Sequence, residues 1–162
     1  MIKQDKVIIY TDGAAKGNPG RAGWAAVILL LQNSGEPRVL VEIGGGVEHA
    51  TNNQMELTGP IEALKHLKNK FSNARNIEIV SDSKYVILGI TEWIFNWQKN
   101  NWRNANKRPV LNRELWEELY ELVKDLKPKW TYVKGHNGDK YNERADVIAT
   151  SFAEGEPVEL KK

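Results

Sequence analysis

KVIIYTDGAAKGNPG, residues 6–20, is the stretch that decides the fold. Its first half is rich in β-branched and aromatic residues, a composition that predicts a strand over 6–11. Glycine, asparagine and proline then crowd into residues 13–20 and predict a loop. Asp12 stands between the two, so the strand is expected to deliver a carboxylate to the edge of a sheet.

Four more strands are predicted after this stretch. Residues 22–31 and 38–43 are apolar and β-branched, and a turn signal at Asn33-Ser34-Gly35 joins them. Short connections favour an antiparallel meander of the first three strands. The last two strands are predicted over 76–81 and 129–133.

Helical spacing of apolar residues begins at Asn53. Asn112 is a good candidate for the N-cap of a later helix that turns Leu115, Leu119, Leu122 and Leu126 inward. The other helices are predicted over 82–90, 93–101 and 142–153. We therefore expect an α/β fold with a five-stranded mixed sheet, its first three strands antiparallel, flanked by helices.

Length and composition limit the class of protein. The 162 residues, 41% hydrophobic and 27% charged, fit one domain over 1–153, followed by a flexible tail over 154–162. No stretch approaches the roughly 20 apolar residues of a membrane span, and no signal peptide is recognisable. The absence of cysteine excludes disulfides and thiolate metal sites. A cytoplasmic monomer with no membrane partner is expected.

Four acidic residues lie next to apolar segments. Taken singly, Asp12 suits a turn, Asp82 a helix cap, Asp146 a helix start and Glu56 an exposed helix face. Taken together, Asp12 and Asp82 both follow predicted strands, and their carboxylates converge if those strands are neighbours. Clustered like charges need a cation, and oxygen ligands without cysteine suit Mg²⁺ or Mn²⁺.

Basic and aromatic side chains gather in residues 93–113, which we call the basic segment. No acidic residue lies between Glu92 and Glu114, although the net charge of the whole chain is only +2. Trp93 and Trp97, four residues apart, share one helix face, and we interpret Trp97 as an anchor to the core. The cations in this gap include Lys99, Arg103, Lys107 and Arg108, a distribution that points to a nucleic-acid partner more than the net charge does.

The motifs YTDGAAKGNPG, ATNNQMELTGPIEAL, VSDSKYV, ITEWIFNWQKNNWR, LW at 115–116 and YVKGHNGDKYNERAD occur in this order. In this order they resemble the bacterial branch of the type 1 ribonuclease H family across nearly the whole chain. The resemblance implies the ribonuclease H-like fold with a basic protrusion formed by the basic segment. It also implies an endonuclease that hydrolyses the RNA strand of RNA–DNA hybrids and leaves 5′-phosphate and 3′-hydroxyl ends.

The resemblance further implies two Mg²⁺ ions during catalysis, for which Mn²⁺ can substitute. Asp12 would bridge the ions, Asp146 would complete the ion beside the attacking water, and Glu56 and Asp82 would complete the other. His136 matches a loop histidine that assists proton transfer or product release.

Substrate contacts are implied by the same resemblance. Asn18, Asn52 and Asn53 match positions that read the minor groove of the hybrid, where the 2′-hydroxyl distinguishes RNA from DNA. Thr51 and Asn112 match a pocket for a DNA-strand phosphate, and Trp93 matches a position that faces the DNA strand. Further phosphate contacts would come from the cations of the basic protrusion, Lys99, Arg103, Lys107 and Arg108.

Three positions depart from the family pattern. Lys84 replaces a glutamine near the RNA strand, so a charge stands where direct readout is usual. His49 replaces an arginine of the phosphate pocket. Pro60 lies inside the first predicted helix and removes the hydrogen bond to the carbonyl of Glu56, which predicts a local kink.

Three other readings compete. A binding module that has lost catalysis would be expected to lack at least one of the four carboxylates, and all four are present. An integrase or resolvase of the same superfold would not explain the TDG…GNPG loop, the basic segment and KGH. A protein–protein interaction domain would leave the convergence of the carboxylates unexplained.

Overall fold

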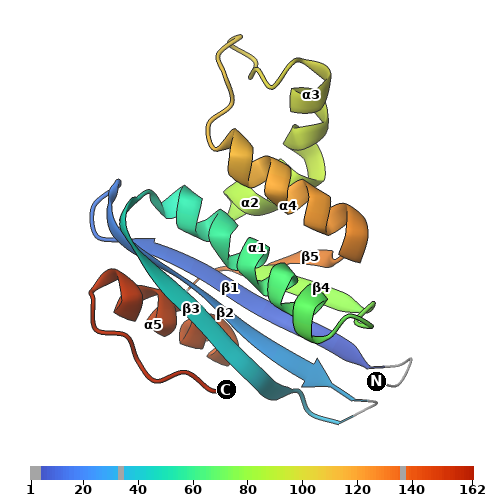
Figure 1. Cartoon of the computed structure of the whole chain (residues 1–162), viewed down its shortest axis with the longest axis vertical. Helices are drawn as coiled ribbons and strands as arrows, with labels where there is room; N and C mark the ends of the chain where they lie inside the picture. Colours follow the sequence, from blue (N-terminus) through green and yellow to red (C-terminus); the bar gives the residue numbers. More distant parts are fainter. Residues whose placement is uncertain (1–4, 33–34, 136–137) are drawn as a thin grey trace.

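The computed structural model describes residues 5–32, 35–135 and 138–162. Its strands form one mixed sheet in the order β3-β2-β1-β4-β5 (Figure 1). The strands are β1 (Lys6–Ala15), β2 (Gly20–Leu31), β3 (Arg38–Ala50), β4 (Ile77–Ser81) and β5 (Lys129–Tyr132). β1 pairs antiparallel with β2, β2 antiparallel with β3, and β4 lies parallel to both β1 and β5. The predicted five-stranded sheet with an antiparallel meander is confirmed.

Both faces of the sheet are covered by helices. α1 (Asn52–Lys70) and α4 (Arg113–Leu126) lie on one face, and α5 (Lys140–Ala153) lies on the other (Figure 1). In β2, Ala26 and Ile28 belong to the larger core beneath α1, whereas Val27 and Leu29 pack against α5. This explains the unbroken apolar run of β2, because a strand that is buried on both faces needs no polar side.

β1 extends beyond its predicted end. Parallel pairing with β4 stops at Thr11 opposite Ser81, but antiparallel pairing with β2 continues to Ala15 opposite Ala22. The strand therefore does not end at Asp12, as the loop-like composition of the following residues suggested, because residues 13–15 stay paired with residues 22–24 of β2. Asp12 instead marks the point where β4 leaves the side of β1.

The predicted helix over 82–90 begins later and is joined to the next one. Ser83, not Asp82, caps α2 (Lys84–Leu88), since its hydroxyl accepts a hydrogen bond from Val86 N at 3.2 Å. A π-helical turn, η1 (Gly89–Trp93), leads directly into α3 (Ile94–Lys99). The predicted capping role therefore belongs to Ser83 and not to Asp82.

Asn112 occupies the N-cap position of α4 but makes no capping hydrogen bond with its side chain. Its backbone is left-handed, with φ 63° and ψ 29°, a conformation that asparagine tolerates better than most residues. Asn112 is therefore the N-cap residue, as predicted, but its side-chain amide bonds to other elements and not to the first turn of α4. In α4, Trp116 is fully buried, and Leu115, predicted to point inward, is only partly buried.

α1 is uninterrupted from Asn52 to Lys70, with Pro60 buried inside it. Thr51 caps the helix by a capping box: its hydroxyl accepts from Gln54 N at 3.1 Å, and the Gln54 side chain accepts from Thr51 N at 2.9 Å. The local kink at Pro60 stays a prediction. None of the described helices is long and apolar enough to cross a membrane.

The flexibility expected for residues 154–162 also stays a prediction, but the structure shows where this segment lies. Val158 and Leu160 pack against the core beneath α5. Glu42, on β3, donates its backbone N–H to Lys161 O at 2.8 Å and accepts from Lys161 N at 3.0 Å through its carboxylate. Arg144, on α5, forms a two-pronged ion pair with the same carboxylate. Glu42 thereby links β3, α5 and the C-terminal segment.

Candidate active site

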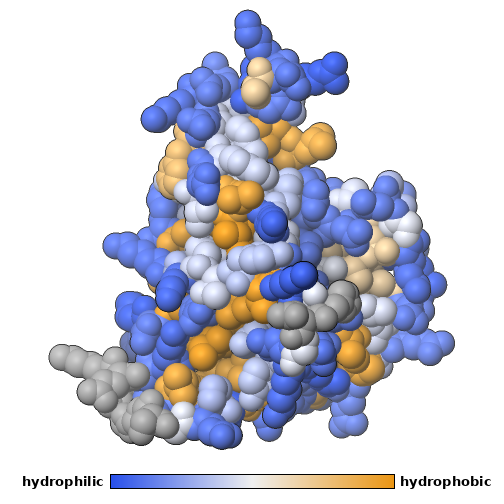
Figure 2. Space-filling model, turned by 180° about the vertical axis from the view of Figure 1, so that it is seen from behind, coloured by the Kyte–Doolittle hydropathy of each residue, from blue (hydrophilic) through white to orange (hydrophobic). Residues whose placement is uncertain are grey.

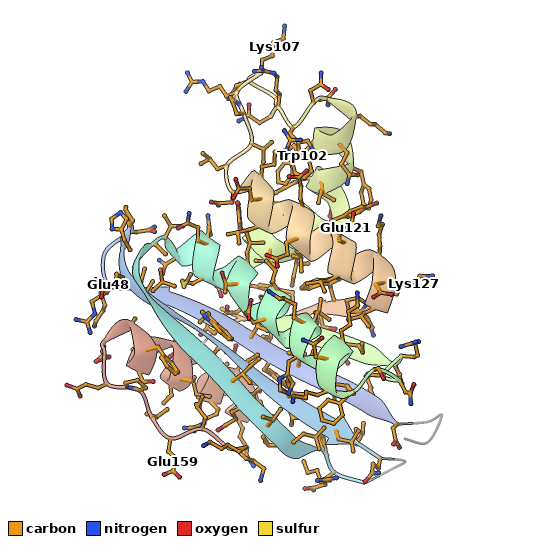
Figure 3. All side chains as sticks on the ribbon, viewed as in Figure 1. Glu48, Trp102, Lys107, Glu121, Lys127 and Glu159 are labelled. Carbon is orange, nitrogen blue, oxygen red and sulfur yellow. The ribbon has the colours of Figure 1, made fainter. Side chains whose placement is uncertain are left out.

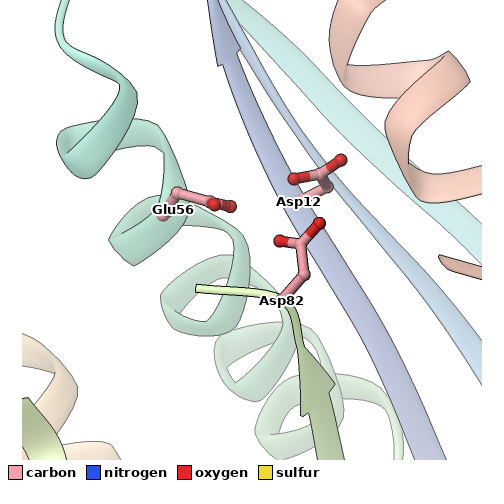
Figure 4. Close-up of side chains that lie close together, drawn as sticks. All are labelled: Asp12, Glu56 and Asp82. Carbon is pink, nitrogen blue, oxygen red and sulfur yellow. The ribbon is translucent and has the colours of Figure 1, made fainter. Parts of the chain in front are cut away.

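Three carboxylates from three elements meet at one end of the β1–β4 pair. Asp12 comes from β1, Glu56 from the second turn of α1, and Asp82 from the residue after β4 (Figure 4). One oxygen from each lies within 4.8 Å of the other two. The convergence that the sequence suggested for Asp12 and Asp82 is confirmed, and Glu56 joins them from the helix that covers the sheet.

Glycine allows α1 to approach this closely. A Cβ at Gly13 would lie 2.6 Å from the backbone nitrogen of Glu56, closer than real Cβ contacts allow. The absence of a side chain at Gly13 therefore sets the separation between β1 and α1. The same contact fixes how far Glu56 stands from Asp12.

Burial and mutual repulsion disfavour ionisation of the cluster. Asp12 is 5% exposed. Its burial, and then the charge of Asp82, raise the pKa of Asp12 to about 8. Burial and then the charges of Asp12 and Asp82 raise the pKa of Glu56 well above its ordinary value. Without a compensating cation the cluster therefore holds protons at neutral pH.

A divalent cation fits this donor set. Glu56 Oε1 is buried and has no hydrogen-bond partner among the described residues. A buried acceptor without a donor is unfavourable, and a metal ion would satisfy it. The three residues offer only carboxylate oxygens, the ligands preferred by hard divalent ions such as Mg²⁺ and Mn²⁺.

Asp146 stands beside the cluster and not within it. It lies in the second turn of α5, and its charge contributes to the raised pKa of Asp12. Asp139 caps α5 by accepting from the backbone N–H groups of Tyr141 and Asn142, so Asp146 is beyond the first turn, where the helix dipole acts most strongly. The helix dipole therefore does not explain why an acidic residue stands at position 146.

Gly135, after β5, lies against one carboxylate of the cluster. A Cβ at Gly135 would lie 2.8 Å from Asp82 Oδ2, so the loop backbone touches this carboxylate. His136, the predicted auxiliary residue, follows immediately in the sequence but lies outside the described residues.

Known proteins share both the sequence and the fold. The RNase H family model matches residues 4–154. A curated Ribonuclease H from Pseudomonas paraeruginosa (strain DSM 24068 / PA7) is 48% identical over 149 residues, which cover 92% of this chain and 94% of the relative. The chain belongs to the ribonuclease H family. A Ribonuclease H from Thermosynechococcus vestitus is 44% identical, over 94% of this chain and 92% of the relative.

Solved ribonuclease H structures have the same architecture. The crystal structure of LC9-RNase H1, a type 1 RNase H, matches with a TM-score of 0.83 and 26% identity, over 96% of this chain and 75% of that one. The solution structure of the PFV RNase H domain, 22% identical with a TM-score of 0.76, shows the same fold over 94% of this chain and 96% of that domain. The sequence-based assignment to the bacterial type 1 branch is confirmed, and this ribonuclease H is an enzyme.

In the ribonuclease H domain, a cavity of about 470 Å³ lies between the start of α1, α2 and the basic segment, and none of the three carboxylates lines it. Four predicted substrate residues line it: Asn18, Thr51, Asn53 and Asn112. Asn52 does not line it, but its backbone N–H donates to Asn18 Oδ1 at 3.0 Å and so ties the β1–β2 loop to the start of α1. His49 is exposed and is not among the residues that line the cavity.

The basic segment projects from the body of the ribonuclease H, with Lys107 at its tip and Trp102 below it (Figure 3). The interpretation of Trp97 as an anchor is confirmed, since its ring packs against Trp102 at 6.1 Å and Trp116 at 5.3 Å between centroids. Trp93 is 38% exposed. Seen from behind, the end of the protrusion is covered by hydrophilic side chains (Figure 2). The exposed cations there are Lys99, Arg103, Lys107 and Arg108.

Two residues at the cavity escaped the sequence analysis. Gln54 and Tyr85 both line it and both hydrogen-bond Asn112, at 3.3 Å and 3.1 Å. The capping-box spacing of Thr51 and Gln54 was the one signal in the sequence, and it explains only the helix cap. Lys84, next to Tyr85, is exposed and lies 5.4 Å from the centre of the Tyr132 ring.

Proposed function

We propose that this ribonuclease H is an endonuclease that cleaves the RNA strand of RNA–DNA hybrids with the help of two Mg²⁺ ions and leaves 5′-phosphate and 3′-hydroxyl ends. The observation that carries the proposal is the convergence of Asp12, Glu56 and Asp82 within 4.8 Å, with Asp146 close enough to influence Asp12. Such a cluster has no structural benefit by itself, because its members repel one another.

In this proposal Asp12, Glu56, Asp82 and Asp146 hold the metal. When bound, divalent ions stabilise the attacking and leaving oxygens of a phosphodiester displacement. The chain itself supplies the ligands in a fixed arrangement, because β1, β4 and α1 are parts of the core. The raised pKa of Asp12 implies that metal binding must displace protons at neutral pH. His136 is assigned to proton transfer or product release.

Substrate binding is assigned to two surfaces. Asn18, Asn52 and Asn53 read the minor groove, where amides can both donate to and accept from a 2′-hydroxyl. Thr51 and Asn112 hold a phosphate of the DNA strand in the cavity. The exposed cations of the basic segment contact further phosphates, together with Lys84 on α2 and the half-exposed ring of Trp93.

The test is a cleavage assay on end-labelled RNA–DNA hybrid, double-stranded RNA, double-stranded DNA and single-stranded RNA. Each substrate is incubated with Mg²⁺, with Mn²⁺ or with EDTA, and the RNA products are analysed for their terminal groups. Cleavage of the RNA strand of the hybrid alone, abolished by EDTA and by Asp12→Asn, is the expected result. Binding of the hybrid without cleavage in either metal would instead support the binding-module reading.

A further inference from the structure

Tyr85 lines the cavity, and its hydroxyl group makes an unusual set of hydrogen bonds. Its hydroxyl oxygen accepts two hydrogen bonds, from Asn112 Nδ2 at 3.1 Å and from Trp116 Nε1 at 3.1 Å. A phenolic oxygen that accepts twice must direct its own proton elsewhere. No described residue accepts that proton, so the O–H group is left as a free donor. The tilted contact of the Tyr85 ring with Trp116, with centroids 5.1 Å apart, keeps the hydroxyl in place.

The cavity that Tyr85 lines contains no charged side chain among its described residues. An anion bound there would be held by neutral donors alone, so the number of those donors and their direction decide the affinity. His49, which departs from the family's arginine, does not line the cavity and leaves this deficit unfilled. An additional neutral donor is therefore valuable at this place.

Gln54 fixes the orientation of the neighbouring donor. Its Nε2 donates to Asn112 Oδ1 at 3.3 Å, while its Oε1 accepts from Thr51 N at 2.9 Å. One lone pair of the Asn112 carbonyl is thereby used, and one of its two N–H groups donates to Tyr85. What remains toward the cavity is the second N–H of Asn112 beside the free O–H of Tyr85. Both are donors, an arrangement that suits an anion and not a cation.

Two segments of the chain contribute residues both to the cavity and to the carboxylate cluster. Thr51 and Gln54 precede Glu56 on α1, and Tyr85 follows Asp82 by three residues at the start of α2. The offset between the two sites is thus fixed by local backbone structure. A phosphate held in the cavity would set the register of the opposite strand against the carboxylates.

We propose that the Tyr85 hydroxyl is a further phosphate-binding donor of this cavity, and that Gln54 is a positioning residue that presents Asn112 beside it. The assignment rests on the proposed function, since the phosphate is one of the DNA strand of a bound hybrid. Trp116 contributes from the core, because its indole N–H occupies a lone pair of the hydroxyl and so directs the proton outward.

The test combines Tyr85→Phe with a set of hybrids in which one DNA phosphate at a time is a neutral methylphosphonate. For the wild-type protein, neutralising the phosphate that occupies the cavity should raise KM about tenfold, as expected for the loss of a hydrogen bond to a charged group. Tyr85→Phe should raise KM on the unmodified hybrid by a similar factor, with kcat changed less than twofold. At that one position the methylphosphonate should then have little further effect.

Tyr120→Phe is the matched control, since it removes a phenolic hydroxyl from α4 at a residue that does not line the cavity. It should leave the wild-type methylphosphonate profile unchanged. Gln54→Glu is the second variant: it keeps the acceptor that caps α1 but places a carboxylate in the cavity. In Gln54→Glu the effect of the methylphosphonate on KM should change sign, so that the substitution at the same DNA position lowers KM instead of raising it.

An unchanged methylphosphonate profile in Tyr85→Phe would overturn the role of Tyr85, and the absence of inversion in Gln54→Glu would overturn that of Gln54. Both results leave hybrid cleavage by the wild-type protein intact. Failure of the wild-type protein to cleave the unmodified hybrid would overturn the proposed function, and this assignment with it.

Discussion

Thr11 and Ser81 form the last pair of the parallel ladder between β1 and β4, and the next residue on each strand is an acidic one. The two carboxylates therefore emerge side by side at the point where the strands separate. β1 stays paired to β2 beyond this point, so Asp12 is held by the sheet, while Asp82 begins the turn into α2. The sheet register, and not a flexible loop, brings the two charges together.

Asp12→Asn is expected to stabilise the metal-free protein while abolishing cleavage. The pKa of Asp12 is about 8 in the folded protein and 3.8 in the unfolded chain. Between these pH values the folded state binds more protons, so the free energy of unfolding of the wild-type protein falls as pH rises from about 4 to about 8. Asp12→Asn has no ionisable group at this position, so its free energy of unfolding does not fall in this way. At pH 8 it should be more stable than the wild-type protein by on the order of 2 kcal/mol.

Thermal unfolding in EDTA at pH 5 and pH 8 measures this difference. The gap between variant and wild type should widen at the higher pH, and addition of Mg²⁺ should stabilise the wild-type protein more than the variant. A variant that is less stable than wild type at pH 8 in EDTA would contradict the repulsion inferred for the cluster.

Gly135→Ala is expected to damage the metal site with little damage to the fold. The new methyl group would lie 2.8 Å from Asp82 Oδ2, so either the loop or the carboxylate must move. Displacement of a catalytic group by about 1 Å can lower the rate about a hundredfold. The Mg²⁺ concentration that gives half-maximal cleavage should rise in this variant.

Gly138→Ala is the control for Gly135→Ala. Among the described residues no atom lies within 4 Å of a Cβ at Gly138, but its φ of +83° is unfavourable for alanine. This variant should lose thermal stability and retain the wild-type Mg²⁺ dependence. Equal shifts of the Mg²⁺ dependence in the two variants would show that Gly135 acts through the loop as a whole and not through Asp82.

Glu42→Gln is expected to loosen α5 and the C-terminal segment. The hydrogen bonds from Arg144, more than any other interaction, hold the pKa of Glu42 below its ordinary value of 4.5. The stability that Glu42 contributes is therefore fully present above that value and is lost as pH falls through its lower folded pKa. The substitution should lower the free energy of unfolding at pH 7 by about 1–3 kcal/mol.

The pH dependence provides the check for Glu42→Gln. Urea unfolding of wild type and variant should give a difference that shrinks as the pH is lowered toward 3. A difference that stays constant over that range would assign the loss to packing and not to the charge of Glu42.

The sheet and the acidic cluster were within reach of the sequence because they depend on local patterns. Short runs of apolar and β-branched residues mark the strands, and a strand followed by an acidic residue marks each of Asp12 and Asp82. Glu56 and Asp146 gained their meaning only from the family resemblance, since an acidic residue on a helix carries no such mark. Their separation from Asp12 depends on how closely each helix packs on the sheet.

The hydrogen-bond network of Asn112 was out of reach for a different reason. Its partners, Gln54 and Tyr85, are 58 and 27 residues away in the sequence, and the helices that carry them meet only in the folded protein. By local rules an asparagine before a helix is a cap, and the tertiary contacts override that preference. Likewise, the glycines and proline of residues 13–20 predicted a loop that hid the strand continuing to Ala15, in which Gly13 is required by the closeness of α1.

Lys107→Ala is expected to weaken binding of nucleic acid without altering the choice of substrate. Lys107 lies at the exposed tip of the basic segment, held there by a loop in which Arg103 Nη1 donates to Lys107 O at 3.0 Å (Figure 3). A contact between this cation and a phosphate releases counterions, so its removal should reduce the slope of log affinity against log salt by about 1. Affinities for hybrid and for double-stranded RNA should fall together, because phosphate contacts carry no information about the sugar.

Lys70→Ala, at the exposed end of α1 away from the protrusion, is the matched loss of charge and should leave the slope unchanged. Affinities are measured by fluorescence anisotropy on a catalytically inactive Asp12→Asn background. Equal slopes with and without Lys107→Ala would show that the tip of the basic segment does not reach the duplex. Binding would then be confined to the cavity and the residues around Trp93.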